Sequence, residues 1–251
     1  MIHFVGAGSG AEDLITLRGA RLLSEADVVI YAGSLVNPAL LKRCRADCEI
    51  HDSASMTLEE VLAVMDQAEQ AGKTTVRLHT GDPSIYGAIR EQMDALEERG
   101  YAYDVTPGVS SFCGAAAALK AEYTLPGVSQ TVIITRAEGR TPVPEREQLK
   151  SLAAHGSTMV LFLSSSLLEK AQADLMAGGY APDTPAAIVY KATWPDEKVY
   201  RCTLSTLAET ARANHVTKTA LITVGGFLGS AYDRARLYDQ GFSHGCREAS
   251  K

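Results

Sequence analysis

The chain has 251 residues, of which 46% are hydrophobic and 22% are charged, so it can bury a full core and is long enough for one large or two small domains. Its formal net charge of −6 and its pI near 5.5 argue against the broad basic surface that nucleic-acid binding needs. We therefore expect no nucleic-acid partner.

Signals for export, for membrane insertion and for metal binding are all missing from the sequence. The first residues, MIHFVGAGSG, lack the basic and apolar regions of a secretory signal, and no later apolar run approaches the roughly 20 residues that span a bilayer. The five cysteines are scattered without CxxC spacing, and the six histidines form no HxxxH or HxH pair. We expect a cytoplasmic protein with no membrane partner, no disulfide framework and no protein-bound metal.

In the first half of the chain, runs of β-branched residues alternate with helical patterns, which is typical of βαβ units and a mainly parallel sheet. The predicted strands are residues 2–5, 27–31, 48–51, 74–79 and 103–106. Thr57 and Glu60 stand at capping-box spacing before a predicted helix that Gly72 ends. Asp82 and Pro83 predict the N-cap and first residue of the next helix.

A predicted helix of small residues, 110–120, leads to a turn-rich stretch, and we place a domain boundary near residue 122. The sequence thus predicts domains over 1–122 and 123–251. The second half restarts with strands at 131–135, 159–163, 186–190, 199–203 and 219–224 and with helices at 147–154, 167–177 and 204–213. The two adjacent strands over 186–203 imply antiparallel pairing, so the second sheet should be mixed. The predicted fold class is α/β with two domains.

The first strand ends in the glycine loop Gly6-Ala7-Gly8-Ser9-Gly10. A dinucleotide site needs GxGxxG and an acidic residue at the end of the second strand, whereas these glycines run GxGxG and the second strand ends at Tyr31. The pattern disfavours a nicotinamide site. A turn that only joins a strand to a helix is the competing interpretation.

Two further glycine loops, 79–87 and 106–111, follow predicted strands whose carboxyl ends share the same sheet edge. Gly81 permits a close backbone approach, and Asp82 can accept hydrogen bonds from a ligand. From the local pattern alone, Asp82 fits the role of a helix cap better. Three glycine loops at one edge predict a cleft for a small molecule.

The second half carries two cationic motifs. Arg136 and Arg140 lie four residues apart at a strand exit, before two prolines that hold the chain extended, and arginine forks match carboxylates. A solvated surface loop explains them equally well. Lys191 stands near Trp194, the only tryptophan, which either fills a core or forms a wall for a flat ligand.

With these motifs the chain resembles the tetrapyrrole methylase family almost from end to end. The matching strings are the GxGxG loop at 6–10, YAGSLV at 31–36, TGDP at 80–83, PGVSS at 107–111, TRAEGRTPVP at 135–144, VYKATWP at 189–195 and FSHG at 242–245. TRAEGRTPVP and VYKATWP resemble the members that act on carbon 11 of the macrocycle. The first loop of the family usually reads GPGDP, but here Ser9, Ala11 and Glu12 replace its proline, aspartate and second proline. The role of that loop is therefore open.

The resemblance implies two α/β domains, a homodimer, and S-adenosylmethionine bound in a cleft between the domains. It implies methyl transfer to carbon 11 of precorrin-4 or its cobalt form in cobalamin biosynthesis. The S-adenosylmethionine contacts that it implies are Gly81, Asp82, Ile85, Ser110, Ser111, Phe162, Leu163, Ala192, Ala220 and Leu221. Candidates for contact with the tetrapyrrole are Arg136, Arg140, Lys191, Trp194 and Tyr31.

No catalytic base can be identified from these residues. A nicotinamide oxidoreductase and a non-catalytic tetrapyrrole carrier are the alternatives from other functional classes. An RNA methylase of the same fold is disfavoured by the acidic composition.

Overall fold

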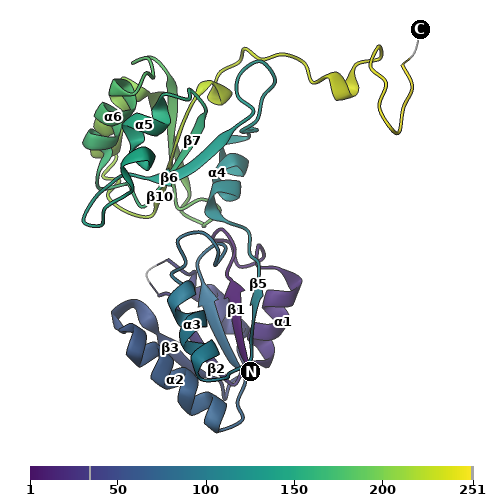
Figure 1. Ribbon diagram of the computed structural model, residues 1–251, viewed down its shortest axis with the longest axis vertical. Coiled ribbons are helices and arrows are strands. Elements are labelled where there is room, and N and C mark those ends of the chain that lie inside the picture. Colours follow the sequence, from purple (N-terminus) through teal and green to yellow (C-terminus); the bar gives the residue numbers. More distant parts are fainter. Residues whose placement is uncertain (34, 250–251) are drawn as a thin grey trace. The chain divides into compact units, whose positions relative to one another are not determined.

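The computed structural model describes residues 1–33 and 35–249. Their contacts divide the chain into two compact units, one of Met1–Ala115 with Ala192–Asp196 and one of Ala116–Lys191 with Glu197 onward (Figure 1). The division falls inside helix α4 (Ser111–Leu119). The boundary near residue 122 stays a prediction. Ser34, part of the YAGSLV string, lies outside the described residues.

The first unit is built on a five-stranded sheet of order β3-β2-β4-β1-β5, in which every pairing is parallel. In chain order the strands are β1 (Ile2–Gly6), β2 (Val28–Tyr31), β3 (Glu49–Asp52), β4 (Thr75–His79) and β5 (Tyr103–Thr106). Each strand end lies within one residue of its predicted position. The predicted parallel sheet is confirmed.

Helices cover both faces of this sheet (Figure 1). Val5 belongs to the buried cluster beneath α1 (Leu17–Glu25), and its neighbour Phe4, fully buried, belongs to the cluster beneath α2 (Leu58–Gln70) and α3 (Arg90–Glu98). This alternation follows from the two-residue period of a strand. The sheet is therefore packed on both faces, and the glycine loops lie at its carboxyl edge.

Helix α2 has the predicted capping box, in which Thr57 and Glu60 bond each other's backbone N–H groups. Helix α1, by contrast, has no counterpart among the predicted elements. Thr16 caps it by accepting a hydrogen bond from the Gly19 amide at 3.0 Å, and only three of its nine residues are buried.

The prediction of a helix beginning at Asp82 is wrong, because α3 begins only at Arg90. Tyr86 and Ala88 have φ of 55° and 48°, in the left-handed region that interrupts a right-handed helix. Residues 83–86 form a turn instead, and the Asp82 Oδ1 atom caps it by accepting the Ser84 amide at 2.9 Å. The apolar spacing from residue 85 onward resembles a helix without forming its first turns.

The second unit contains a mixed sheet, as predicted, and its strand order is β6-β7-β10-β8-β9. Only β6 and β7 pair in parallel, and the other three pairings are antiparallel. The strands are β6 (Val132–Arg136), β7 (Thr158–Phe162), β8 (Pro185–Tyr190), β9 (Lys198–Thr203) and β10 (Ala220–Val224), and the helices packed in this unit are α5 (Leu149–Ala153), α6 (Leu168–Ala177) and α7 (Leu207–Ala213). Among the described residues, no helix has the length and hydropathy needed to cross a bilayer.

Candidate active site

The three glycine loops meet at the carboxyl edge of the parallel sheet. Gly8 and Gly81 exchange backbone hydrogen bonds of 3.2 and 3.1 Å, which joins the first loop to the second. The Gly108 amide donates to Asp82 Oδ2 at 2.8 Å, which joins the second loop to the third. The three loops therefore converge as predicted, and hydrogen bonds join them to one another.

Glycine is required where these loops touch. A Cβ atom built on Gly6 lies 2.5 Å from Gly108 Cα and 2.6 Å from the Gly81 carbonyl oxygen. A Cβ on Gly108 meets the same Gly81 oxygen and lies 2.8 Å from Gly6 Cα. Because the obstructing atoms are backbone, any side chain at Gly6 or Gly108 would push the loops apart.

The Asp82 carboxylate is fully engaged by its surroundings. Oδ1 accepts the amide and the hydroxyl of Ser84, and Oδ2 accepts the amide of Gly108. Desolvation raises the pKa of Asp82, but these hydrogen bonds more than offset it and hold the pKa below its ordinary value. Asp82 is therefore ionised at neutral pH and acts as a joint between two loops.

The other predicted S-adenosylmethionine contacts of the first unit lie around this joint. Ser110 packs against Gly81 and is only 6% exposed, yet its hydroxyl makes no hydrogen bond to another residue in the described part of the chain. Ile85 lies half-buried in the turn after Asp82, and Ser111 begins α4. The edge thus offers a nearly buried hydroxyl and close-packed backbone, which fits a polar small molecule.

Residues 192–196, which belong to the first unit, are held by the first loop. Thr193 Oγ1 accepts the Ala11 amide at 3.0 Å and lies 3.2 Å from Ser9 Oγ. Trp194 lies over Gly10, where a Cβ would collide with the indole ring. Ser9 and Ala11 are two of the positions that depart from GPGDP, and proline at position 9 has no hydroxyl to offer. The first loop therefore holds the segment that carries Trp194.

We expect Thr193→Val to loosen this contact, because valine keeps the shape of threonine but can form neither hydrogen bond. An ordinary hydrogen bond contributes about 0.5 to 1.5 kcal/mol, so the free energy of unfolding should fall by about 1 to 3 kcal/mol. Urea denaturation measures the change, with Thr217→Val, at an exposed threonine, as the matched control. Equal unfolding midpoints for the Thr193 variant and the wild type would contradict this account.

Tyr31, a predicted wall for the tetrapyrrole, ends β2 half-buried. Its hydroxyl donates to Asp52 Oδ2 at 3.3 Å, while Asp52 Oδ1 accepts the Gly33 amide at 3.1 Å. Desolvation, followed by the negative charge of Asp52, raises the pKa of Tyr31. The phenol therefore stays neutral and its ring is held at the β2 end of the edge.

His79 ends β4 and begins the second loop, but it is a poor proton acceptor. It is 4% exposed and stacks on Phe4, with ring centroids 5.9 Å apart. Desolvation, aided by the charge of Arg77, lowers the pKa of His79 to about 3. The imidazole is neutral at physiological pH and has little affinity for a proton.

In the second unit, the two predicted tetrapyrrole arginines and one predicted S-adenosylmethionine contact surround a single hollow of about 320 Å³. Arg136 and Arg140 form part of its rim together with Leu163, which is 59% exposed. The residues that line it are Arg136, Ala137, Gly139, Arg140, Thr141, Leu163, Ser166 and Leu167. The TRAEGRTPVP loop therefore folds into a concave, cationic surface beside the end of β7.

The two arginines differ in what they bond. The guanidinium of Arg136 donates to the carbonyl oxygens of Ala137, Thr141 and Pro142 at 3.4, 3.2 and 2.7 Å. Arg140 is exposed and makes no hydrogen bond or ion pair with another residue in the described ranges. Arg136 thus holds the loop closed, and Arg140 keeps its fork available for a ligand.

The remaining predicted contacts of this unit lie at strand ends. Ser165 Oγ donates to the Ala220 carbonyl at 3.0 Å, which brings the segment after Phe162 to the start of β10. Leu221 is only 7% exposed. The ammonium group of Lys191 lies 5.5 Å from the centroid of the Tyr190 ring. The next residue, Ala192, is also a predicted S-adenosylmethionine contact and is 6% exposed, but it belongs to the first unit.

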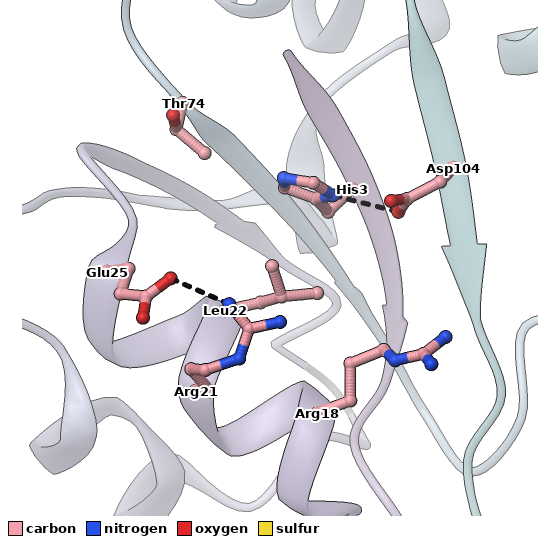
Figure 2. A pocket seen from close by; sticks show the side chains of 7 residues that line it. All are labelled: His3, Arg18, Arg21, Leu22, Glu25, Thr74 and Asp104. Carbon is pink, nitrogen blue, oxygen red and sulfur yellow. Dashed lines mark hydrogen bonds and ion pairs between the residues drawn. The ribbon is translucent and has the colours of Figure 1, made fainter.

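A second hollow, of about 460 Å³, lies at the amino ends of the strands of the first unit and is shown in Figure 2. Several of its polar side chains are paired, because His3 lies 2.8 Å from Asp104 and Arg21 lies 3.1 Å from Glu25. It lies at the opposite edge of the sheet from the glycine loops. We therefore assign it no part in the candidate active site.

Residues 1–208 match the family model for tetrapyrrole (corrin/porphyrin) methylases. The chain belongs to this family. The assignment made from the sequence motifs is confirmed. A protein of Methanocaldococcus jannaschii named cobalt-precorrin-4 C(11)-methyltransferase is 53% identical over 251 residues, covering 100% of this chain and 97% of the relative. A precorrin-4 C(11)-methyltransferase of a Sinorhizobium species is 44% identical, covering 96% of each chain.

Solved structures of the family share the fold. The X-ray structure of a cobalamin biosynthetic enzyme, cobalt precorrin-4 methyltransferase, superposes with a TM-score of 0.89 at 48% identity, covering 91% of this chain and 96% of the other. The uroporphyrin-III C-methyltransferase of Thermus thermophilus, solved with S-adenosyl homocysteine, gives a TM-score of 0.76 at 26% identity, covering 90% and 92%. The predicted tetrapyrrole methylase fold is confirmed.

Proposed function

We propose that this tetrapyrrole methylase transfers a methyl group from S-adenosylmethionine to carbon 11 of precorrin-4 or cobalt-precorrin-4. The observation that carries the proposal is the TRAEGRTPVP loop, which forms a cationic hollow and leaves the fork of Arg140 free for a carboxylate. The names of the relatives that match the whole chain support carbon 11 as the position.

S-adenosylmethionine supplies a methyl group that is already activated, so the protein's main task is to align it with a nucleophilic carbon. We propose that the loop edge around Gly81, Asp82 and Ser110 binds this donor, with Ile85 and Ser111 beside it. Phe162, Leu163, Ala192, Ala220 and Leu221 stay predicted contacts. Arg140 orients the macrocycle through a carboxylate, and no covalent enzyme intermediate is needed.

The reaction is tested with the purified protein, S-adenosylmethionine and each form of the tetrapyrrole. We expect a product heavier by one methyl group, and we expect S-adenosylmethionine and its demethylated product to bind at one site per chain. NAD should not compete in a calorimetric titration, since the glycine loop is GxGxG. Binding of NAD without binding of S-adenosylmethionine would favour the oxidoreductase instead. A carrier would bind the tetrapyrrole but not methylate it.

We further propose a homodimer in the cytoplasm as the working form, with a small-molecule substrate and no nucleic-acid or membrane partner. The family resemblance supports the dimer, and the acidic composition supports the absence of nucleic acid. Light scattering of the purified protein tests the dimer.

A further inference from the structure

The last part of the second unit, residues 229–249, follows β10 and adds no strand to the sheet; we call it the C-terminal arm (yellow in Figure 1). It includes the FSHG string and one short 3-10 helix, η6 (Arg236–Tyr238). Four of its large apolar side chains are exposed: Tyr232 is 61% exposed, Leu237 52%, Tyr238 70% and Phe242 39%. Four such side chains within one short segment suggest a binding surface.

The arm has an internal order of its own. The Arg247 guanidinium donates to the carbonyl oxygens of Leu237 and Asp239 at 2.9 and 2.5 Å, and the backbones of His244 and Arg247 pair at 2.8 and 2.9 Å. At its base, the Asp233 amide donates to the Pro126 carbonyl at 2.9 Å. The arm is therefore a closed turn with a fixed root, and its rings are partly positioned before any ligand arrives.

The formal charges of the arm balance, because it carries three arginines, Arg234, Arg236 and Arg247, and three carboxylates, Asp233, Asp239 and Glu248. The guanidinium groups of Arg234 and Arg236 are exposed and make no hydrogen bond or ion pair with another residue in the part of the chain that the structure describes. Asp239 accepts the Gly241 amide at 2.8 Å, and the carboxylate of Asp233 lies against Gly127. The arm thus presents two unpaired arginines among three aromatic rings.

We propose that the C-terminal arm is part of the tetrapyrrole-binding surface, with its rings against the macrocycle and Arg234 and Arg236 on its carboxylates. The inference rests on the proposed function, which supplies a flat substrate that carries carboxylates. Aromatic rings pack on flat conjugated ligands, and arginine forks bind carboxylates bidentately. An anionic membrane is a poorer match, because it is recognised by clusters of four or more cations.

The arm, measured as an extended chain from its root, is at least as long as the strand that leads to the hollow of its own unit. From its root at Asp233, Tyr238 is five residues away and Phe242 nine, which spans up to about 17 and 30 Å at about 3.3 Å per residue. Strand β6, which ends at Arg136 beside the hollow, is five residues long and so spans about 17 Å.

The test uses full-length protein in which Arg234→Gln and Arg236→Gln are combined, and a second variant, Tyr238→Ala. The control, Lys150→Gln with Arg212→Gln, removes the same two charges from the exposed surfaces of α5 and α7. Titration of cobalt-precorrin-4 in the presence of S-adenosylhomocysteine gives the tetrapyrrole affinity, and calorimetry gives the affinity for S-adenosylhomocysteine. We expect both arm variants to bind the tetrapyrrole about tenfold more weakly, with S-adenosylhomocysteine affinity and thermal midpoint unchanged and the control equal to wild type.

Arm variants that bind cobalt-precorrin-4 as tightly as wild type overturn the proposal. Should they instead lose dimerisation in light scattering, or binding to phosphatidylserine vesicles, while keeping tetrapyrrole affinity, the arm serves a second copy or a membrane and the proposal is equally wrong. Failure of the wild type itself to bind cobalt-precorrin-4 counts against the proposed function, which separates the two inferences.

Discussion

Replacing Arg140 with alanine is expected to weaken tetrapyrrole binding about 30-fold or more and to leave the affinity for S-adenosylmethionine within about twofold. Truncating one partner of a desolvated ion pair costs about 2 to 5 kcal/mol, and 2 kcal/mol is about 30-fold in affinity. An exposed pair contributes only about 0.2 to 1 kcal/mol. The size of the loss therefore reports whether the carboxylate and Arg140 exclude water from each other. Lysine should restore only part of the affinity, because it lacks the bidentate fork.

The Arg136→Ala variant should be compared with Arg140→Ala, because the two arginines make different contacts. The guanidinium of Arg136 bonds three loop carbonyls, so Arg136→Ala should lower both the stability to urea and the tetrapyrrole affinity, whereas Arg140→Ala should leave stability unchanged. Arg146→Ala, at an exposed arginine of the neighbouring 3-10 helix, controls for the loss of charge. If Arg140→Ala binds the tetrapyrrole like wild type at low salt, Arg140 belongs to the solvated surface loop that its sequence also allowed.

The sheets of both units could be predicted because strand signals are local. Runs of β-branched residues between glycine and proline turns place every strand, and the glycine loops locate the carboxyl edge. Helix caps could be predicted from the sequence where the capping side chain and the backbone amide lie in one turn, as for Thr57 and Glu60. The cap prediction was wrong at Asp82, because this residue caps a turn instead of a helix. The left-handed backbone of Tyr86 and Ala88 prevents a helix from beginning before Arg90.

The different roles of residues within the candidate site depend on tertiary contacts, which the spacing of residues in the sequence does not reveal. Sequence places Arg136 and Arg140 together as equivalent cations, yet only the folded loop returns the carbonyls of Thr141 and Pro142 to Arg136. Likewise, Ser9 and Thr193 are 184 positions apart, and their contact gives Ser9, one of the departures from the family pattern, a partner that the sequence does not indicate. In both cases the missing information is tertiary.

Replacing Asp82 with asparagine is expected to separate the second and third glycine loops and to weaken S-adenosylmethionine binding about 30-fold or more. Asparagine keeps one acceptor oxygen, so either Ser84 or the Gly108 amide must face an NH₂ donor. A hydrogen bond to a charged group contributes about 1.5 to 3 kcal/mol, and an unsatisfied amide adds about 1 to 3 kcal/mol. Calorimetric titration measures the affinity. Ser84→Ala is the control, because it removes one donor and keeps the bond to Gly108.

The same variant carries a pH signature, because the folded-state pKa of Asp82 is held below its ordinary value. A carboxylate with a lowered pKa adds stability that is complete above the unfolded pKa and is lost as pH falls through the folded pKa. The difference in unfolding free energy between wild type and Asp82→Asn should therefore be constant across neutral pH and shrink only in acid, below the ordinary aspartate range. A difference that shrinks near pH 7 would implicate another group. If the asparagine variant binds S-adenosylmethionine and unfolds like wild type, the Gly8–Gly81 bonds and the packing of Gly6 on Gly108 hold the edge without the charge.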